Sequence, residues 1–248
     1  MNLVIDIGNT RFKYAFFSNN EPYSFGTKEE ELFKEICRQK EKGEPLYALI
    51  CGSGRVEDEL RERLKTEIPY CLEPADKPKL PIKIEYETPD TLGFDRIASA
   101  VGANKLFPQQ PLLVIDIGTA ITYDYVGADN SFLGGNISPG TMLRFKALHA
   151  FTDKLPYLEV PQTSAQQFQE YGKNTKEAIV SGVMSGILFE VKQYMERFLQ
   201  NYVNGKVVIT GGDSPLITGK LEQEFCFVEH LCLAGLNIIL SHNYKKSS

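Results

Sequence analysis

Residues 112–120 read LLVIDIGTA and repeat, almost residue for residue, the opening stretch LVIDIGNT of residues 3–10. In both copies an apolar run ends in Asp-Ile-Gly and a short polar turn, so that Asp6 corresponds to Asp116. Each copy is followed by a segment in which apolar side chains alternate, which is typical of a strand that runs back from a turn. The repeat therefore predicts two domains of one design, with a boundary near residue 110.

Outside the repeat, apolar residues recur either at every second position or at steps of three and four residues. The first spacing predicts strands and the second predicts helices. The expected helices span about residues 28–42, 56–64, 95–107, 140–151, 175–202 and 232–243, and the expected strands include 12–16, 46–51, 121–126, 132–137 and 206–209. This order predicts an α/β protein with one domain in residues 1–110 and the other in residues 111–248.

The composition argues against several classes of protein. The chain of 248 residues has 27 Lys and Arg against 32 Asp and Glu, a net charge of −5, and its longest basic run is Lys245-Lys246. Binding to nucleic acid is therefore not expected. No apolar stretch approaches about 18 residues, so we expect no membrane span and a cytoplasmic protein. The five cysteines are scattered without a Cys-x-x-Cys pair, which favours reduced thiols over a zinc site.

The two Asp-Ile-Gly turns are candidate phosphate-binding sites. Glycine allows a tight turn whose backbone N–H groups, with a hydroxyl such as that of Thr10, can contact phosphate oxygens. Asp6 can hold a cation-bound water beside them. For either copy alone, the alternative is a turn in which Asp and Asn only bond their own backbone. Because a nucleotide cleft requires two such turns, their recurrence favours nucleotide binding. The Walker A and Gly-x-Gly-x-x-Gly patterns are missing from the sequence, which argues against the other common ways of binding phosphate.

The turns and the strand pairs around them resemble the superfamily of actin, Hsp70 and sugar kinases over nearly the whole chain. That resemblance implies two duplicated RNase-H-like domains, as in actin-like ATPases, with a cleft between them. Residues 89–96, PDTLGFDR, resemble the Gly-x-Asp-Arg signature of type III pantothenate kinases, and residues 134–140, GGNISPG, resemble their GGxIxPG loop. The resemblance implies direct transfer of the γ-phosphate of ATP to pantothenate, which is the first step of coenzyme A biosynthesis.

The resemblance assigns the acceptor site to the segment from Gly93 to Arg96. A carboxylate within hydrogen-bond reach of an alcohol can take its proton, so Asp95 is the expected catalytic base. A guanidinium pairs with a carboxylate through two hydrogen bonds, so Arg96 is expected to bind the acid group of pantothenate. The alternative is a helix start with Asp95 as a capping or first-turn residue and Arg96 as a surface charge. The implied substrate contacts are Tyr86, Gly93, Phe94, Asp95, Arg96 and Thr175.

The implied ATP contacts lie in both turns. They are Asp6, Ile7, Gly8, Asn9, Thr10, Arg11, Phe12 and Lys13 in the first copy and Thr119 in the second. Mg²⁺ is expected to accompany ATP, with Asp6 holding it through water, and the resemblance implies a monovalent cation, K⁺ or NH₄⁺, at Asp116. Residues 210–213, TGGD, resemble the adenosine loop of the superfamily, although a plain turn between strand and helix is the alternative.

Several of these residues also have purely structural alternatives. Tyr86 ends a segment in which apolar residues alternate, so it could pack on a strand. Thr175 begins the long predicted helix and could be its N-cap. Lys13 and Arg11 can neutralise phosphate, but as alternating strand residues they could also face solvent.

A homodimer is implied by the same resemblance, with Thr175 offered to pantothenate across the subunit interface. Small residues at 181–182 and 185–186 would let two copies of the long helix approach, burying Val183 and Ile187. The alternative is that these small residues pack the helix on its own sheet.

Two other functions share parts of this pattern. A sugar or acetate kinase of the same superfamily would keep the phosphate turns but need a different acceptor pocket, and the Gly-x-Asp-Arg segment argues against it. A non-catalytic nucleotide-binding relative that acts in transcription activation would keep the fold. The joint presence of Asp6, Asp95, Arg96 and Asp116 argues for an enzyme instead.

Overall fold

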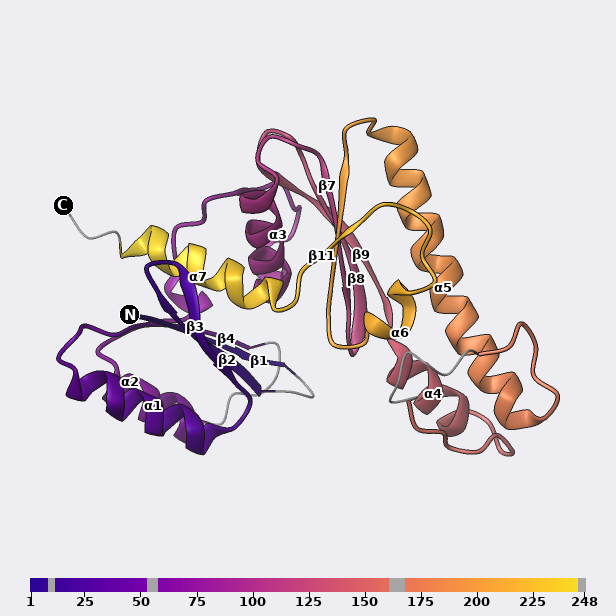
Figure 1. Cartoon of the computed structure of the whole chain (residues 1–248), viewed down its shortest axis with the longest axis horizontal. Helices are drawn as coiled ribbons and strands as arrows, with labels where there is room; N and C mark the ends of the chain where they lie inside the picture. Colours follow the sequence, from indigo (N-terminus) through magenta and orange to yellow (C-terminus); the bar gives the residue numbers. More distant parts are fainter. Residues whose placement is uncertain (9–11, 53–57, 161–167, 245–248) are drawn as a thin grey trace. The chain divides into compact units, whose positions relative to one another are not determined.

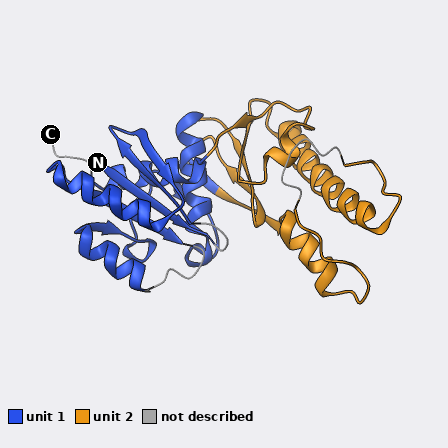
Figure 2. Cartoon of the chain, turned by 60° about the horizontal axis from the view of Figure 1, so that its bottom comes forward, with its two compact units in different colours: residues 1–108, 130–132, 230–248 blue, residues 109–129, 133–229 orange. Residues whose placement is uncertain are grey.

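The computed structural model describes residues 1–8, 12–52, 58–160 and 168–244. Figure 1 follows the chain from the first strand to the last helix. Two compact units, coloured separately in Figure 2, comprise residues 1–108, 130–132 and 230–248 (unit 1) and residues 109–129 and 133–229 (unit 2). Among the described helices, none combines the length and apolar character needed to cross a membrane.

Unit 1 contains a five-stranded sheet in the order β3-β2-β1-β4-β5. Its strands are β1 (Asn2–Ile7), β2 (Phe12–Ser18), β3 (Glu21–Gly26), β4 (Tyr47–Gly52) and β5 (Tyr70–Leu72). The central strand β1 pairs antiparallel with β2 and parallel with β4. Helices α1 (Glu29–Glu41) and α2 (Asp58–Glu67) connect the strands, and Leu32 and Ile36 of α1 are fully buried in the core of this unit.

The second sheet has the order β11-β10-β7-β8-β9-β6. Its strands are β6 (Lys83–Ile84), β7 (Leu112–Ile117), β8 (Ala120–Val126), β9 (Ser131–Pro139), β10 (Lys206–Thr210) and β11 (Cys226–Phe227). The central strand β7 pairs antiparallel with β8 and parallel with β10, as β1 does with β2 and β4. Apart from β6, the second sheet therefore repeats the connectivity of the first, which confirms the predicted duplication and the α/β fold class.

The remaining elements complete the two halves of the repeat. They are η1 (Pro74–Asp76), η2 (Pro89–Thr91), α3 (Phe94–Leu106), α4 (Thr141–Ala150), α5 (Thr175–Asn201), α6 (Pro215–Thr218) and α7 (Leu231–Asn243). The six helices expected from apolar spacing correspond to α1 to α5 and α7, although α2 begins and ends a few residues later than predicted. Glycine and proline at the predicted boundaries account for this agreement.

The last helix, α7, belongs to unit 1 although it follows the second sheet in the sequence. It packs on α3 without intervening side chains, because a Cβ on Gly235 would lie 1.7 Å from the carbonyl oxygen of Ala98. Asn2 of β1 also donates hydrogen bonds to Asn237 (2.8 Å) and Ser241 (2.9 Å) of α7. The compact units thus differ from the predicted ranges 1–110 and 111–248 at residues 109–110, 130–132 and 230–248.

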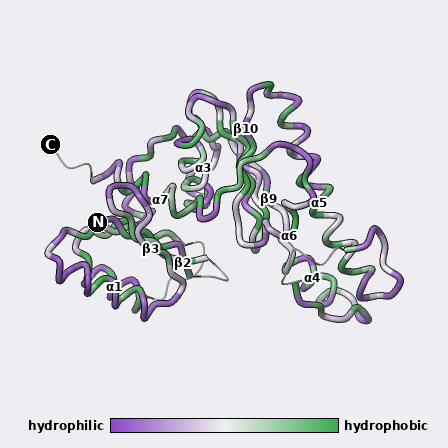
Figure 3. Tube along the Cα trace, viewed as in Figure 1, coloured by the Kyte–Doolittle hydropathy of each residue, from purple (hydrophilic) through white to green (hydrophobic). Residues whose placement is uncertain are grey.

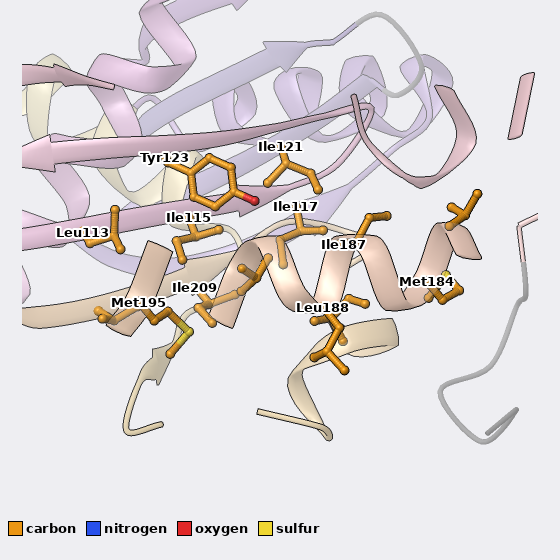
Figure 4. Packing of buried hydrophobic residues seen from close by; sticks show 14 of the residues in the cluster. Leu113, Ile115, Ile117, Ile121, Tyr123, Met184, Ile187, Leu188, Met195 and Ile209 are labelled. Atoms are coloured by element: carbon orange, nitrogen blue, oxygen red, sulfur yellow. The ribbon is translucent and has the colours of Figure 1, made fainter. Parts of the chain in front are cut away.

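The core of unit 2 forms between the second sheet and α5. Leu113, Ile115 and Ile117 alternate along β7 and are fully buried, as period-two spacing requires for one face of a strand. Figure 4 shows these side chains and Ile187, Leu188 and Met195 of α5 around one apolar cluster. Each such side chain stabilises the fold by about 1.5–3 kcal/mol. Figure 3 shows the apolar residues gathered along the strands and along α7.

Candidate active site

The end of β1 contains a partly buried acidic group. Asp6 lies in β1 opposite Lys13 of β2 and Cys51 of β4. Burial raises the pKa of Asp6 to about 6, the negative charge of Asp95 adds to the increase, and Lys13 opposes it. Burial also raises the pKa of Cys51, and so do the charges of Asp6 and Asp95. Asp6 and Asp95, 89 positions apart in the sequence, are therefore electrostatic neighbours.

Asp95 is held by the first turn of α3. Its Oδ1 accepts a hydrogen bond from the backbone N–H of Arg96 at 2.9 Å. The N-cap of α3 is Gly93, and a Cβ there would lie 2.4 Å from the same Oδ1. Gly93 therefore leaves room for the Asp95 carboxylate beside the backbone. Asp95 is a first-turn residue but not the cap, and this position is compatible with a catalytic role.

Arg96 is not a surface charge, because it is only 7% exposed. Its guanidinium carbon lies 6.0 Å from the ring centre of Tyr86 and 5.7 Å from that of Phe132. The two rings are themselves 6.2 Å apart in an edge-on arrangement. Cation–π attraction therefore restrains the guanidinium. Tyr86 was expected here, whereas Phe132 was missed because its sequence context is an ordinary apolar strand.

The second turn is braced by the last glycine of the GGNISPG segment. The N–H of Gly140 donates to the carbonyl oxygen of Thr119 at 3.0 Å, and the N–H of Gly118 donates to the carbonyl oxygen of Ala120 at 3.0 Å. A Cβ on Gly140 would lie 2.0 Å from the carbonyl oxygen of Gly118. The segment singled out in the sequence therefore packs directly on the turn that contains Thr119, with no space for a larger residue.

The TGGD loop contacts the end of β7, which leads into the same turn. Gly211 has φ +102°, and a Cβ there would lie 2.3 Å from the carbonyl oxygen of Ile117 and 2.5 Å from Oδ1 of Asp116. The N–H of Asp213 donates to the carbonyl oxygen of Ile117 at 2.9 Å, and Ser214 Oγ donates to that of Gly211 at 2.6 Å. Three sequence segments, each with a glycine at the contact, thus meet in unit 2 close to Asp116 and Thr119.

Comparison with known proteins identifies the family. Residues 2–197 match the family model of the type III pantothenate kinases. The chain belongs to this family. A type III pantothenate kinase from Phocaeicola vulgatus is 40% identical over 253 aligned positions that cover 99% of this chain and 100% of the relative. One from Porphyromonas gingivalis is 36% identical, with 98% of each chain covered. The predicted family and the prediction of a kinase are confirmed.

Solved structures of lower sequence identity share the fold. A Baf family transcriptional activator from Campylobacter jejuni has a TM-score of 0.62 at 21% identity, with 98% of this chain and 99% of that chain covered. The activator of 2-hydroxyisocaproyl-CoA dehydratase from Clostridium difficile, solved with bound ADPNP, has a TM-score of 0.55 at 14% identity, with 99% and 94% covered. These similarities support the α/β fold with two sheets and nothing narrower.

The structure describes only some of the other expected site residues. Asn9, Thr10 and Arg11 lie outside the described residues. Ile7 is buried at the end of β1, Gly8 follows it, and Phe12 begins β2. Phe94 is the first residue of α3.

Thr175 is exposed and is the first residue of α5. The helix is capped instead by Asn174, whose side chain accepts from the N–H of Glu177 at 3.0 Å. The N-cap alternative for Thr175 is therefore wrong, and its hydroxyl is not required to start the helix.

The residues present fit a magnesium nucleotide better than a metal bound by protein alone. Among the described residues, no group of three His, Cys, Asp or Glu side chains is arranged to hold a metal ion. Mg²⁺ usually keeps several waters and binds one or two carboxylates together with substrate phosphates. The pair of carboxylates at Asp6 and Asp95 matches that requirement, because burial and then the charge of Asp95 raise the pKa of Asp6, and a cation nearby would offset the repulsion between the two charges.

We expect Asp6→Asn to stabilise the ligand-free protein at neutral pH. Because folding raises the pKa of Asp6 to about 6, the folded protein holds this proton more tightly than the unfolded chain, and this contribution to stability is lost as the pH rises through about 6. The free energy of unfolding should rise by about 1–3 kcal/mol at pH 8 and by little near pH 4. Denaturant unfolding at both pH values measures this. Equal destabilisation at both would contradict the electrostatic account.

Proposed function

We propose that this chain transfers the γ-phosphate of ATP to the primary hydroxyl of pantothenate, the first step of coenzyme A biosynthesis. The main observation in support of this proposal concerns Asp95 in the acceptor segment. Its side chain is partly buried, and its charge acts on Asp6, next to the first phosphate turn. A kinase needs a group that takes or orients the hydroxyl proton beside the phosphate-binding turn. The family of the chain makes pantothenate the acceptor.

Asp95 is the proposed catalytic base. Its Oδ1 is engaged by the N–H of Arg96, and no hydrogen bond from the described residues to its Oδ2 competes for a substrate hydroxyl. That oxygen can accept the proton as the hydroxyl oxygen attacks the γ-phosphorus in line with the departing ADP. The transfer is direct, so no phosphorylated residue of the enzyme is required.

Asp6 to Lys13 and Thr119 are the proposed ATP contacts. Mg²⁺, bound with ATP and held through water by Asp6, would neutralise charge on the phosphates. Asp116 is the proposed site of a monovalent cation, K⁺ or NH₄⁺. The support for this site is the backbone carbonyl oxygen of Ile117, which lies together with Oδ1 of Asp116 beside Gly211 and gives two oxygen atoms for a cation.

Arg96 is the proposed partner of the pantothenate carboxylate, with Tyr86, Gly93, Phe94 and Thr175 as further substrate contacts. A guanidinium restrained by two aromatic rings loses less freedom when it forms a bidentate pair. Gly93 has no side chain, so the Asp95 carboxylate lies against its backbone at the start of α3. This arrangement supports recognition of an acidic acceptor.

The acceptor is tested by the release of ADP. We expect turnover to depend on pantothenate and to be absent with glucose, acetate or glycerol, because only pantothenate offers both a primary hydroxyl and a carboxylate for Arg96. The same assay with and without K⁺ tests the cation at Asp116. Turnover with a sugar but not with pantothenate would overturn the proposed acceptor, and ATP binding without turnover on any acceptor would favour a non-catalytic relative.

A homodimer is the proposed assembly, formed through the exposed face of α5. Phe189 is 67% exposed, and a Cβ added at Gly182, two turns earlier on the same face, would have no atom within 4 Å. Val183 and Ile187, which were expected to be buried by a partner, instead belong to the core of unit 2. The face available to a second copy therefore centres on Phe189.

The proposed site of action is the cytoplasm, where the five free cysteines would stay reduced.

Mixing of inactive variants tests whether the acceptor site is shared. Asp95→Asn and Thr175→Ala subunits should each be inactive or strongly impaired alone, and hybrid dimers should regain one intact site per dimer if Thr175 serves the neighbouring subunit. ADP release after subunit exchange measures this. A fully active monomer by light scattering, or no recovery despite proven exchange, would contradict a shared site.

A further inference from the structure

Glu190 of α5 accepts hydrogen bonds from three other elements of unit 2. The hydroxyl of Tyr123 on β8 donates to Oε1 at 3.0 Å, and Ser138 Oγ on β9 donates to the same oxygen. Arg144 of α4 donates from Nη2 to Oε2 and forms an ion pair there. Burial raises the pKa of Glu190, but the hydrogen bonds from Ser138, Arg144 and Tyr123 outweigh it and lower the pKa overall. The carboxylate is therefore ionised at neutral pH.

One of these partners, Ser138, belongs to the GGNISPG segment, and a second, Arg144, donates a hydrogen bond to that segment. Ser138 and Pro139 are the fifth and sixth residues of GGNISPG, and Arg144 donates from Nε to the carbonyl oxygen of Pro139 at 2.8 Å. Glu190 thus restrains this segment directly through Ser138 and indirectly through Arg144. The packing of α5 does not require this charge, because the apolar residues Ile187 and Val191 on either side of Glu190 are fully buried.

The restrained segment continues directly into Gly140, which is in contact with the second turn. The next residue, Gly140, donates its N–H to the carbonyl oxygen of Thr119 at 3.0 Å. A Cβ on Gly140 would overlap the carbonyl oxygens of Gly118 (2.0 Å) and Thr119 (2.6 Å). A shift of residues 138–139 would therefore move the backbone of the turn, since no gap separates the two.

We propose that Glu190 is a positioning residue for ATP, which acts by fixing residues 138–139 so that Gly140 holds the turn of Thr119 in place. This inference rests on the proposed contact between Thr119 and ATP. Glu190 touches neither substrate nor nucleotide in this account. Its charge matters because an ionised acceptor forms stronger hydrogen bonds than a neutral amide and fixes the orientation of the guanidinium.

The test compares Glu190→Gln with the wild type. We expect the Kd of a non-hydrolysable ATP analogue, measured by calorimetry, and the KM for ATP to rise about tenfold, the effect of losing about one charged hydrogen bond. The KM for pantothenate should stay within about twofold, because the acceptor segment lies in unit 1 and Thr175, the proposed acceptor contact on α5, lies 15 positions before Glu190. Ser138→Ala, a milder change, should raise the Kd of the analogue by about threefold. Glu196→Gln, at an exposed position of the same helix, is the matched control and should change neither constant.

Thermal unfolding and Thr119→Val separate the possible outcomes. If Glu190 only stabilises unit 2, Glu190→Gln lowers the Tm and the active fraction without changing the Kd of the analogue in the folded protein, and the inference is overturned. If Thr119→Val weakens the analogue but Glu190→Gln and Ser138→Ala do not, Thr119 keeps its proposed role and the inference alone fails. If Thr119→Val has no effect, the proposed ATP contact fails and the inference fails with it. Weaker binding of the analogue in all three variants supports both the proposed contact between Thr119 and ATP and the positioning role of Glu190.

Discussion

Asp95→Asn should lower kcat by about 10²- to 10⁴-fold, the range typical for loss of a general base. The amide has the size of the carboxylate, and its oxygen can still accept the hydrogen bond from the N–H of Arg96 at 2.9 Å. What it cannot do is take a proton from the hydroxyl of pantothenate. Steady-state ADP release at saturating ATP and pantothenate measures the loss.

The Kd values for both substrates should change little, because the amide preserves the start of α3. Asp90→Asn, an exposed carboxylate five residues earlier in the same segment, is the matched control and should leave kcat unchanged. Near-normal turnover in Asp95→Asn, with binding intact, would make Asp95 a structural first-turn residue. A second readout is available in the same variant. Because the charge of Asp95 helps to raise the pKa of Asp6, that pKa should fall.

The repeat and the glycine-containing segments could be predicted from the sequence because their causes are local. Apolar residues at a period of two or at steps of three and four decide which face of a strand or helix is buried. The duplicated LVIDIG stretches predict two strands in equivalent positions, and the sheet orders confirm this. The segments GGNISPG and TGGD were singled out as motifs, and both contain a glycine whose Cβ would overlap the second turn.

Contacts between distant segments could not be predicted, since no local pattern specifies them. Residues 231–240, LCLAGLNIIL, are apolar around the whole helix and so predict burial, but not burial against α3. The close approach depends on Gly235 meeting Ala98, 137 positions away. The contacts of Phe132 with Arg96 and of Glu190 with Ser138 also join residues that are far apart in the sequence. Each is a single residue whose role depends on a partner far along the chain.

Gly140→Ala should weaken ATP binding by about 10- to 100-fold with a smaller effect on the acceptor site. The φ of Gly140 is −74°, so alanine meets no backbone strain there, and the effect is purely steric. Its Cβ would lie 2.0 Å from the carbonyl oxygen of Gly118 and 2.6 Å from that of Thr119. Both atoms are backbone, so the clash cannot be relieved by a side-chain rotation. Overpacking of this kind typically costs about 1–3 kcal/mol, and the middle of that range, about 1.4–2.7 kcal/mol, corresponds to about 10- to 100-fold in an equilibrium constant.

The change should appear in the nucleotide constants, because the overlap forces the turn of Thr119 to move. Calorimetry with a non-hydrolysable ATP analogue gives the Kd, and thermal unfolding shows whether the strain is also spread through unit 2. Gly219→Ala is the control, since a Cβ there has no atom within 4 Å, and it should bind the analogue as the wild type does. If Gly140→Ala binds the analogue normally and is only less stable, the GGNISPG segment is a structural brace. If both stability and binding are normal, the backbone around Gly118 can move without consequence, and the second turn is not the rigid phosphate site that the duplicated sequence predicts.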